Sequence, residues 1–439
     1  MQTVDTLIHA RWIIPVEPAH TLLQDHSLVL QQNRILDLLP RAEAEQRYAA
    51  RHTHTLSHHA LIPGLINAHT HAAMNLLRGY ADDHRLMDWL EKYIWPAESR
   101  WVNERFVEAG TTLAVAEMIR SGVTCFNDMY FYPEIAARVA QAAGMRAVIG
   151  LILLDFPSAW AGSSDEYLQK GLDLHDSLLH APLIRTAFAP HAPYTVSDQP
   201  LERIAALSSE LELPVHIHLH ETAQEISASL EQHGCRPLQR LQRLGLVSPA
   251  LVAVHMTQLE DDEIALLAQH GVSVVHCPES NMKLASGICP VTRLLEHGVN
   301  VALGTDSVAS NNDLDMLGEL RSAALLAKVH SGNAEAVPAF TALQMATLNA
   351  ARALGLDDSL GSLRPGKAAD LVAIDFDAVE TQPVYDPVST LVYSCRPHNV
   401  SHVWVDGRLL LNNRDFCTIE IESVIAEARE WAEKIGRTG

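Results

Sequence analysis

Apolar runs alternate with amphipathic stretches through the middle of the chain. Several of these stretches have helical periodicity, among them residues 105–120, 201–211 and 260–270. The apolar runs are residues 61–68, 123–129, 146–154, 184–189, 215–219, 251–255, 272–277 and 299–304. Continuous apolar strands that alternate with helices predict a parallel sheet whose two faces are both buried. Eight such units predict an α/β protein built on a closed (β/α)8 TIM barrel.

The two ends of the chain have a different pattern. Short strands joined by turns are predicted at both ends, over residues 6–14, 27–31, 34–39, 370–374 and 403–411. A last helix is predicted over residues 421–435. We therefore expect a barrel domain over residues 61–360. It is flanked by a strand-rich N-terminal part, residues 1–60, and by a C-terminal part with strands and the helix, residues 361–439.

An open, doubly wound sheet is the alternative fold. It predicts a glycine-rich phosphate-binding loop after the first strand, and Pro63-Gly64-Leu65 lacks that spacing. The segment 361–368 has the glycine and lysine spacing of a P-loop. However, Ala368 stands where a hydroxyl would bind magnesium, and Pro365 removes a backbone donor. We interpret this segment as a turn that leads into the next strand.

Composition and charge exclude several partners. The chain has 53 acidic and 32 basic residues and a formal charge of −21, so it lacks the basic face that nucleic acid requires. Its longest apolar run, residues 147–154, is far shorter than the roughly 20 residues that span a bilayer. The N-terminal segment lacks the apolar core of a signal peptide, and the six cysteines include no C-x-x-C pair. We expect a cytoplasmic protein that binds neither nucleic acid nor membrane.

Histidines and acids gather where the predicted barrel strands end, which is where barrel enzymes carry their chemistry. These residues are His69, His71, His191, His218, Glu221, His255 and Asp306. The H-x-H at 69–71 points two imidazoles to one face, because strand side chains alternate. Residues 52–54 repeat that spacing outside the barrel, so H-x-H alone is a weak signal. Three imidazoles with a carboxylate suit Zn²⁺, with Fe²⁺ and Mn²⁺ as alternatives.

The strand over 215–219 offers more than one ligand. His216, His218 and His220 share one face if the strand is regular. We favour His218 as the ligand, because Glu221 follows three residues later, where the chain can curl over the metal. His216 is the alternative ligand. His220 is expected in a loop or behind the ligands.

The order H-x-H, H-x-x-E, His and a late Asp resembles the amidohydrolase superfamily, and within it the mononuclear deaminases. Residues 63–71 resemble the first metal motif of that group. Residues 361–371 resemble the return into a small β-sandwich that both chain ends build together. The fourth predicted barrel strand and the residues after it, 184–194, contain no Lys, whereas binuclear members use a carboxylated Lys in this strand. The resemblance covers nearly the whole chain and implies a single metal ion.

Within this superfamily the chain is most similar to deaminases of 5′-methylthioadenosine, S-adenosylhomocysteine and adenosine. The resemblance implies that Trp89 contacts the nucleoside, that Glu98 binds the ribose hydroxyls and that His191 contacts the substrate. A related enzyme has an Arg for the homocysteine carboxylate after the third barrel strand, and Gly150 is interpreted as that position in this chain. This difference favours methylthioadenosine or adenosine as the substrate.

These residues predict a hydrolytic deamination that yields the inosine analogue and ammonia. The predicted zinc ligands are His69, His71, His218 and Asp306, with one position left open for water. Glu221 is predicted to move a proton from that water to purine N1. His255 is predicted to hydrogen-bond the attacking oxygen, and Asp306 to pass a proton to the leaving amine.

Two other classes of function remain open. A guanine deaminase or an s-triazine chlorohydrolase would share the metal ligands and differ only in the substrate pocket. A non-enzymatic scaffold would show losses among the ligands, and none is lost. The sequence leaves the oligomeric state open, and a homo-oligomer is one alternative.

Overall fold

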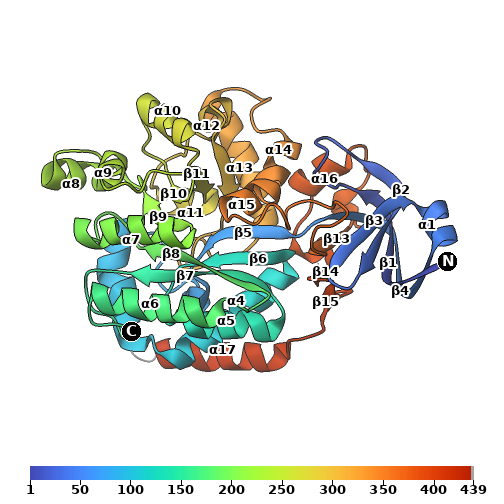
Figure 1. Ribbon diagram of the computed structural model, residues 1–439, viewed down its shortest axis with the longest axis horizontal. Helices are drawn as coiled ribbons and strands as arrows, with labels where there is room; N and C mark the ends of the chain where they lie inside the picture. The colour runs from blue at the N-terminus through green and yellow to red at the C-terminus, as the bar shows by residue number, and fades with distance from the viewer. Residues whose placement is uncertain (437–439) are drawn as a thin grey trace.

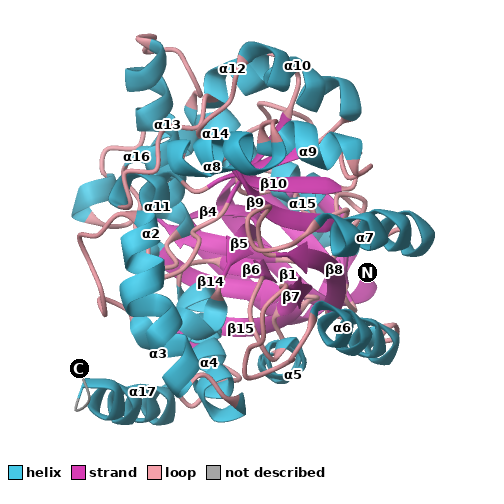
Figure 2. Ribbon diagram, turned by 90° about the vertical axis from the view of Figure 1, so that its left-hand side faces the viewer, coloured by secondary structure: helices cyan, strands magenta, loops and turns pink. Residues whose placement is uncertain are grey.

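The computed structural model describes residues 1–436, and its centre is an eight-stranded parallel barrel (Figures 1 and 2). The strands, which pair in sequence order, are β5 (Leu65–Thr70), β6 (Val123–Asp128), β7 (Arg146–Leu153), β8 (Ile184–Pro190), β9 (Val215–Leu219), β10 (Leu251–His255), β11 (Ser273–His276) and β12 (Asn300–Leu303). The segment after β12 closes the barrel against β5. There the Asp306 N–H donates to the His69 carbonyl at 3.0 Å, and Asp306 forms a parallel bridge with Thr70. The predicted barrel is confirmed.

Helices surround the barrel in Figure 2, as an α/β barrel requires. They are α4 (Glu104–Arg120), α5 (Pro133–Ala143), α6 (Ser164–Leu178), α7 (Asp198–Leu211), α8 (Ala223–His233), α9 (Pro237–Arg243), α10 (Asp261–His270), α11 (Pro278–Lys283), α12 (Val291–Glu296), α13 (Met316–Ser331), α14 (Ala339–Met345) and α15 (Leu348–Ala353). Strand side chains such as Val148, Val252 and Ala302 join residues of α15 in one buried cluster. Because this cluster draws on seven of the eight strands, it fills the inside of the barrel.

Both ends of the chain build a second sheet beside the barrel (Figure 1). Its order is β16-β15-β14-β13-β4-β1-β2-β3. The strands are β1 (Gln2–Ile13), β2 (Leu23–Gln31), β3 (Arg34–Pro40), β4 (Tyr48–Pro63), β13 (Leu371–Asp375), β14 (Val400–Val405), β15 (Arg408–Asn412) and β16 (Asp415–Phe416). At the β3 edge, Ile35 N–H donates to the Lys367 carbonyl and Ala369 N–H to the Asn33 carbonyl, both at 2.9 Å. The sheet therefore curls back towards the start of β13 and encloses its own core.

The remaining elements lie between strands of the second sheet, in the segment that joins β5 to α4, or at the end of the chain. They are α1 (Arg41–Arg47), the 3-10 helix η1 (Ala72–Leu77), α2 (Leu86–Trp89), the π-helical turn η2 (Leu90–Ile94), α3 (Trp95–Trp101), the 3-10 turns η3 (Val379–Thr381) and η4 (Pro397–Asn399), α16 (Pro387–Tyr393) and α17 (Ile421–Gly436). The last helix packs under the barrel, where the ring of Trp431 lies 5.4 Å from that of Phe106 on α4. Among residues 1–436, no helix has the length and apolarity to cross a membrane.

The prediction of one strand over 61–68 is wrong. Residues 61–63 end β4, and Gly64 separates them from β5. A Cβ at Gly64 would lie 1.9 Å from Oγ1 of Thr124, so this crossing of the two units requires glycine. The long strand β4 was not predicted, because its first half is rich in polar, exposed residues. The second H-x-H, residues 52–54, lies in this strand of the second sheet, away from the barrel.

Candidate metal centre and substrate pocket

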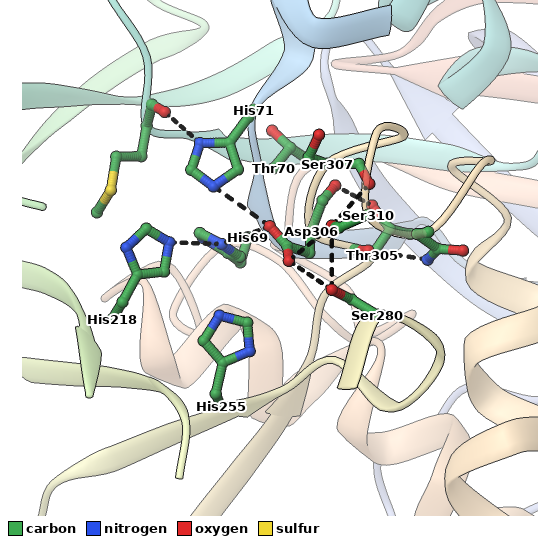
Figure 3. Close-up of polar contacts among 12 residues, drawn as sticks. His69, Thr70, His71, His218, His255, Ser280, Thr305, Asp306, Ser307 and Ser310 are labelled. Carbon is green, nitrogen blue, oxygen red and sulfur yellow. Dashed lines mark hydrogen bonds and ion pairs between the residues drawn. The ribbon is translucent and has the colours of Figure 1, made fainter. Parts of the chain in front are cut away.

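Four predicted ligands converge at the carboxyl end of the barrel (Figure 3). They are His69, His71, His218 and Asp306, and their ligand atoms all lie within 4.8 Å of one another. Oδ1 of Asp306 lies 3.2 Å from Nε2 of both His69 and His71, and Nε2 of His218 lies 3.2 Å from Nε2 of His69. Tetrahedral Zn²⁺ with bonds near 2.0–2.1 Å separates its ligand atoms by about 3.3 Å. Three imidazole nitrogens and one carboxylate oxygen at these distances fit a zinc ion.

Hydrogen bonds behind the ligands orient each one. Nδ1 of His71 lies 2.6 Å from the Met129 carbonyl, and Nδ1 of His218 lies 2.7 Å from the His191 carbonyl. A carbonyl only accepts, so each Nδ1 carries the proton and each Nε2 presents its lone pair to the centre. On Asp306, the oxygen Oδ2 accepts hydrogen bonds from Ser280 and Ser310 at 2.6 and 3.0 Å. This arrangement leaves Oδ1 free for a metal.

Electrostatics keep the carboxylate of the centre ionised. Burial is the largest single influence and would raise the pKa of Asp306, but the neighbouring imidazoles of His69 and His71 together hold that pKa well below its usual range. Burial is also the largest influence on His218, where it lowers the pKa of the imidazole well below 6.5. An ionised carboxylate and a neutral imidazole are the forms that bind a metal.

Glu221 and His255 face the centre from the ends of β9 and β10. Oε2 of Glu221 lies 3.9 Å from Nε2 of His255. Asn281 Oδ1 lies 2.8 Å from Nδ1 of His255, so the Nδ1–H donates there and Nε2 is left for the pocket. Burial raises the pKa of Glu221, and the neighbouring His255 opposes that rise. A buried carboxyl group with a raised pKa suits a group that both accepts and delivers a proton.

A cavity of about 500 Å³ opens above these residues. Its lining includes the predicted residues His71, Trp89, Glu98, His191, His218, Glu221, His255 and Asp306. The ligand His69 is fully buried beneath it. The structure therefore brings all the predicted site residues to one pocket.

Trp89 and Glu98 reach the pocket from the segment over 86–101. Nine residues are about two and a half turns of a regular α-helix, which would place the two side chains on opposite faces. The π-helical turn η2 lies between them and changes the angle around the helix axis that separates the two side chains. Both side chains consequently line the same cavity.

The loops after β6 and β7 contribute pocket residues that the sequence did not reveal. Tyr130 donates a hydrogen bond from its hydroxyl to Oε1 of Glu98 at 2.7 Å. Burial raises the pKa of Glu98 to about 7, and the Tyr130 hydroxyl opposes that rise. Phe131, Leu154 and Phe156 also line the cavity. Their only sequence signal is that each ends a predicted barrel strand or lies two residues after one.

His216 and His220 lie outside the ligand set. Nε2 of His216 lies 2.8 Å from Nδ1 of His69, so His216 supports a ligand from behind. The ring of His220 is buried elsewhere, where its Nε2 accepts from the Leu238 N–H at 3.1 Å. Of the histidines of this strand, His218 alone belongs to the four-residue cluster.

The interpretation of Gly150 as the position after the third strand is wrong. Gly150 lies in the middle of β7, where a Cβ would be 2.6 Å from the Asp128 carbonyl and 2.9 Å from the Ala189 Cβ. No arginine fits between these neighbouring strands. The segment that follows β7 and reaches the pocket is residues 154–159.

The comparisons with known proteins agree with this geometry. A sequence model of the amidohydrolase family matches residues 60–410. The chain belongs to the amidohydrolase family. A 5-methylthioadenosine/S-adenosylhomocysteine deaminase of Teredinibacter turnerae is 51% identical over 99% of this chain and 98% of its own. An adenosine deaminase of Xanthomonas campestris, solved with bound zinc, is 50% identical over the whole of both chains, with a TM-score of 0.99.

A solved structure with lower sequence identity shares the fold. The zinc complex of an atrazine chlorohydrolase from Arthrobacter aurescens aligns with 97% of this chain and 100% of its own, with a TM-score of 0.91. Its sequence identity is 23%, so this likeness concerns the architecture alone.

Proposed function

We propose that this amidohydrolase deaminates a 5′-substituted adenosine by hydrolysis, releasing ammonia and the corresponding inosine analogue. One zinc ion is held by His69, His71, His218 and Asp306. The observation that carries the proposal is the pairing of Glu221 with His255 beside this ligand cluster, at the floor of a pocket that also contains Glu98. The names of the full-length relatives support the same reaction.

The reaction needs a nucleophile, a proton carrier and a group that stabilises charge. When bound, zinc supplies a water molecule whose pKa is lowered towards ~7. Glu221 accepts a proton from the attacking water and delivers it to purine N1, which makes C6 electrophilic. Nε2 of His255 hydrogen-bonds the oxygen that joins C6. Ionised Asp306 takes the second proton of that water from the hydroxyl on C6 and passes it to the amino group, so that C6=O forms, the C6–N bond breaks and ammonia leaves.

The rest of the pocket positions the nucleoside. Ionised Glu98 accepts hydrogen bonds from the two ribose hydroxyls, with Tyr130 holding its Oε1 at 2.7 Å. Trp89, 5% exposed, packs against the nucleoside. His191 contacts the base near the ligand His218, whose ring centroid lies 4.9 Å away. These roles place the base over Glu221 and the 5′ position toward the outer part of the pocket.

The 5′ substituent is neutral. No Lys or Arg is among the described residues that line the cavity, and its outer wall includes Trp95 and Phe156, whose rings lie 6.3 Å apart. A homocysteine carboxylate would lose water there without gaining a cationic partner, which is costly. We therefore propose methylthioadenosine or adenosine as the better substrate, and S-adenosylhomocysteine as the poorer one. A single free nucleoside also suits a chain with a formal charge of −21, whereas nucleic acid does not.

A substrate panel tests the proposed function. The zinc-loaded protein is assayed with adenosine, methylthioadenosine, S-adenosylhomocysteine, guanine and an s-triazine, and kcat/KM is measured for each. We expect ammonia from the adenosine derivatives, the largest kcat/KM for those with a neutral 5′ group, and no reaction with guanine or the triazine. Inertness toward every adenosine derivative would overturn the proposal.

A further inference from the structure

The backbone turns sharply between the metal ligand His218 and Glu221. In a regular strand, His218 and His220 would share one face and Glu221 would point to the other. The strand β9 ends at Leu219, and His220 has a φ of +53°, in the left-handed region that a non-glycine residue rarely adopts. This conformation breaks the alternation. Glu221 consequently lines the same pocket as His218.

One buried carboxylate holds this turn from the N–H side. Oε1 of Glu225 accepts the N–H of His220 at 3.0 Å, and Oε2 accepts the N–H of Glu221 at 2.7 Å. Glu225 is 8% exposed and lies in the first turn of α8, where its own N–H donates to Oγ1 of the N-cap Thr222. Both oxygens of a single side chain are thus committed to two consecutive backbone donors.

The carbonyl side of the turn is held by the next strand-to-helix loop. The His220 carbonyl accepts the N–H groups of Thr257 and Gln258 at 3.0 and 3.2 Å. The Thr257 hydroxyl donates to the Glu221 carbonyl at 2.7 Å. Since the carbonyls have partners in this loop, the N–H groups depend on Glu225 alone to complete the turn.

We propose that Glu225 is a positioning residue that aims the Glu221 carboxylate at the reacting purine. Glu225 is absent from the residues that line the pocket and from the ligand cluster, so it acts through the backbone of Glu221. This inference rests on the proposed role of Glu221 in deamination. Losing the Glu225 carboxylate should therefore lower kcat and leave zinc binding and KM largely intact.

The test compares Glu225→Gln with the wild-type protein, both full length and zinc-loaded, with methylthioadenosine as substrate. The glutamine NH₂ group cannot accept a hydrogen bond, so one of the two backbone donors loses its partner. We expect kcat to fall by about 10²-fold, because small misplacements of catalytic groups have effects of that size. We expect KM to change by less than about threefold and zinc to stay at one per chain, because the ligands are untouched. Hydrogen exchange at the amides of residues 220 and 221 should become faster.

Two further variants separate positioning from general damage. Glu231→Gln makes the same chemical change at an exposed position of α8 and should match the wild type in every measurement. Adding Glu225→Gln to Glu221→Gln should lower the residual kcat no further, because the effect of Glu225 passes through Glu221. Should Glu225→Gln fail to fold, Glu225→Asp is measured in the same assays, with the same split between kcat and KM expected.

A kcat for Glu225→Gln close to the wild-type value would overturn the positioning role. A fall in kcat accompanied by loss of zinc and a large change in KM would overturn it as well. So would a double variant in which the decreases in kcat from the two substitutions add. These outcomes differ from a failure of the proposed function, in which the wild-type protein itself releases no ammonia from any adenosine derivative.

Discussion

Glu221 and His255 face one another across the floor of the pocket, with Oε2 of the carboxylate 3.9 Å from Nε2 of the imidazole. This separation is too long for a hydrogen bond between them. Instead, the backbone N–H of Glu221 donates to Glu225, and the ring of His255 is held by Asn281. Both groups therefore remain available to a substrate atom placed between them, which is how a proton carrier and a charge-stabilising group need to be arranged.

Glu221→Gln should remove turnover and keep the metal. The amide has the shape of the carboxyl group, but it cannot carry a proton between water and purine N1. We expect kcat for methylthioadenosine to fall by about 10²–10⁴-fold, while zinc content measured by atomic absorption stays at one per chain. Normal turnover by this variant would show that Glu221 is not the proton carrier.

Ser280→Ala should weaken zinc binding. The Ser280 hydroxyl donates to Oδ2 of Asp306 at 2.6 Å and so keeps Oδ1 directed at the centre. Loss of such a partner typically lowers metal affinity by about 10–100-fold, which competition with a chromophoric chelator will measure. Ser227→Ala, at an exposed position of α8, is the matched control and should bind zinc like the wild type. Equal affinity in the two variants would contradict the prediction.

Phe156→Arg should shift the substrate preference toward S-adenosylhomocysteine. Phe156 lies at the rim of the pocket and is 41% exposed, so the substitution adds a cation near the 5′ position at little cost to folding. We expect the ratio of kcat/KM for S-adenosylhomocysteine over methylthioadenosine to rise by about tenfold or more, the effect of one charge-assisted hydrogen bond. Phe156→Gln, which is polar and neutral, should leave the ratio near its wild-type value. An unchanged ratio in Phe156→Arg would place the 5′ group elsewhere.

The KM for the nucleoside should depend on pH near neutrality. Burial raises the pKa of Glu98 to about 7. Below this value the carboxyl is protonated and accepts ribose hydroxyls less well, so KM should rise as the pH falls. Tyr130→Phe removes a donor that stabilises the ionised form, so the inflection in KM should move to higher pH. Tyr393→Phe on α16, outside the pocket lining, should leave the profile unchanged. A shift to lower pH in Tyr130→Phe would contradict the assignment.

The barrel and its ligands were predictable because their signals are local. Each strand is a short apolar run, and the candidate ligands lie near the ends of these runs, His218 one residue before the end of β9 and Asp306 three residues after β12. The sequence did not separate β4 from β5, because apolar residues continue across Gly64 and only the close approach of Thr124 reveals the break. Gly150 was placed after the third strand, although the predicted run over 146–154 and the observed β7 both contain it.

The supporting residues could not be predicted, because they act through contacts between distant segments. Tyr130 meets Glu98 across 32 positions of the chain, and Ser280 meets Asp306 across 26. The sequence predicts that the chain curls at Glu221, but the left-handed conformation of His220 that produces this curl leaves no mark in the strand pattern. The members of the candidate metal cluster were predicted from the sequence, whereas their orientation required the fold.

Isotope labelling of the product tests the central claim most directly. The zinc-loaded protein is incubated with methylthioadenosine in H₂¹⁸O, and the product is analysed by mass spectrometry together with the ammonia released. Hydrolytic deamination at C6 predicts methylthioinosine that carries one ¹⁸O atom at C6, with one ammonia for each molecule formed. Recovery of unchanged methylthioadenosine, or of a product without the label, would contradict the account.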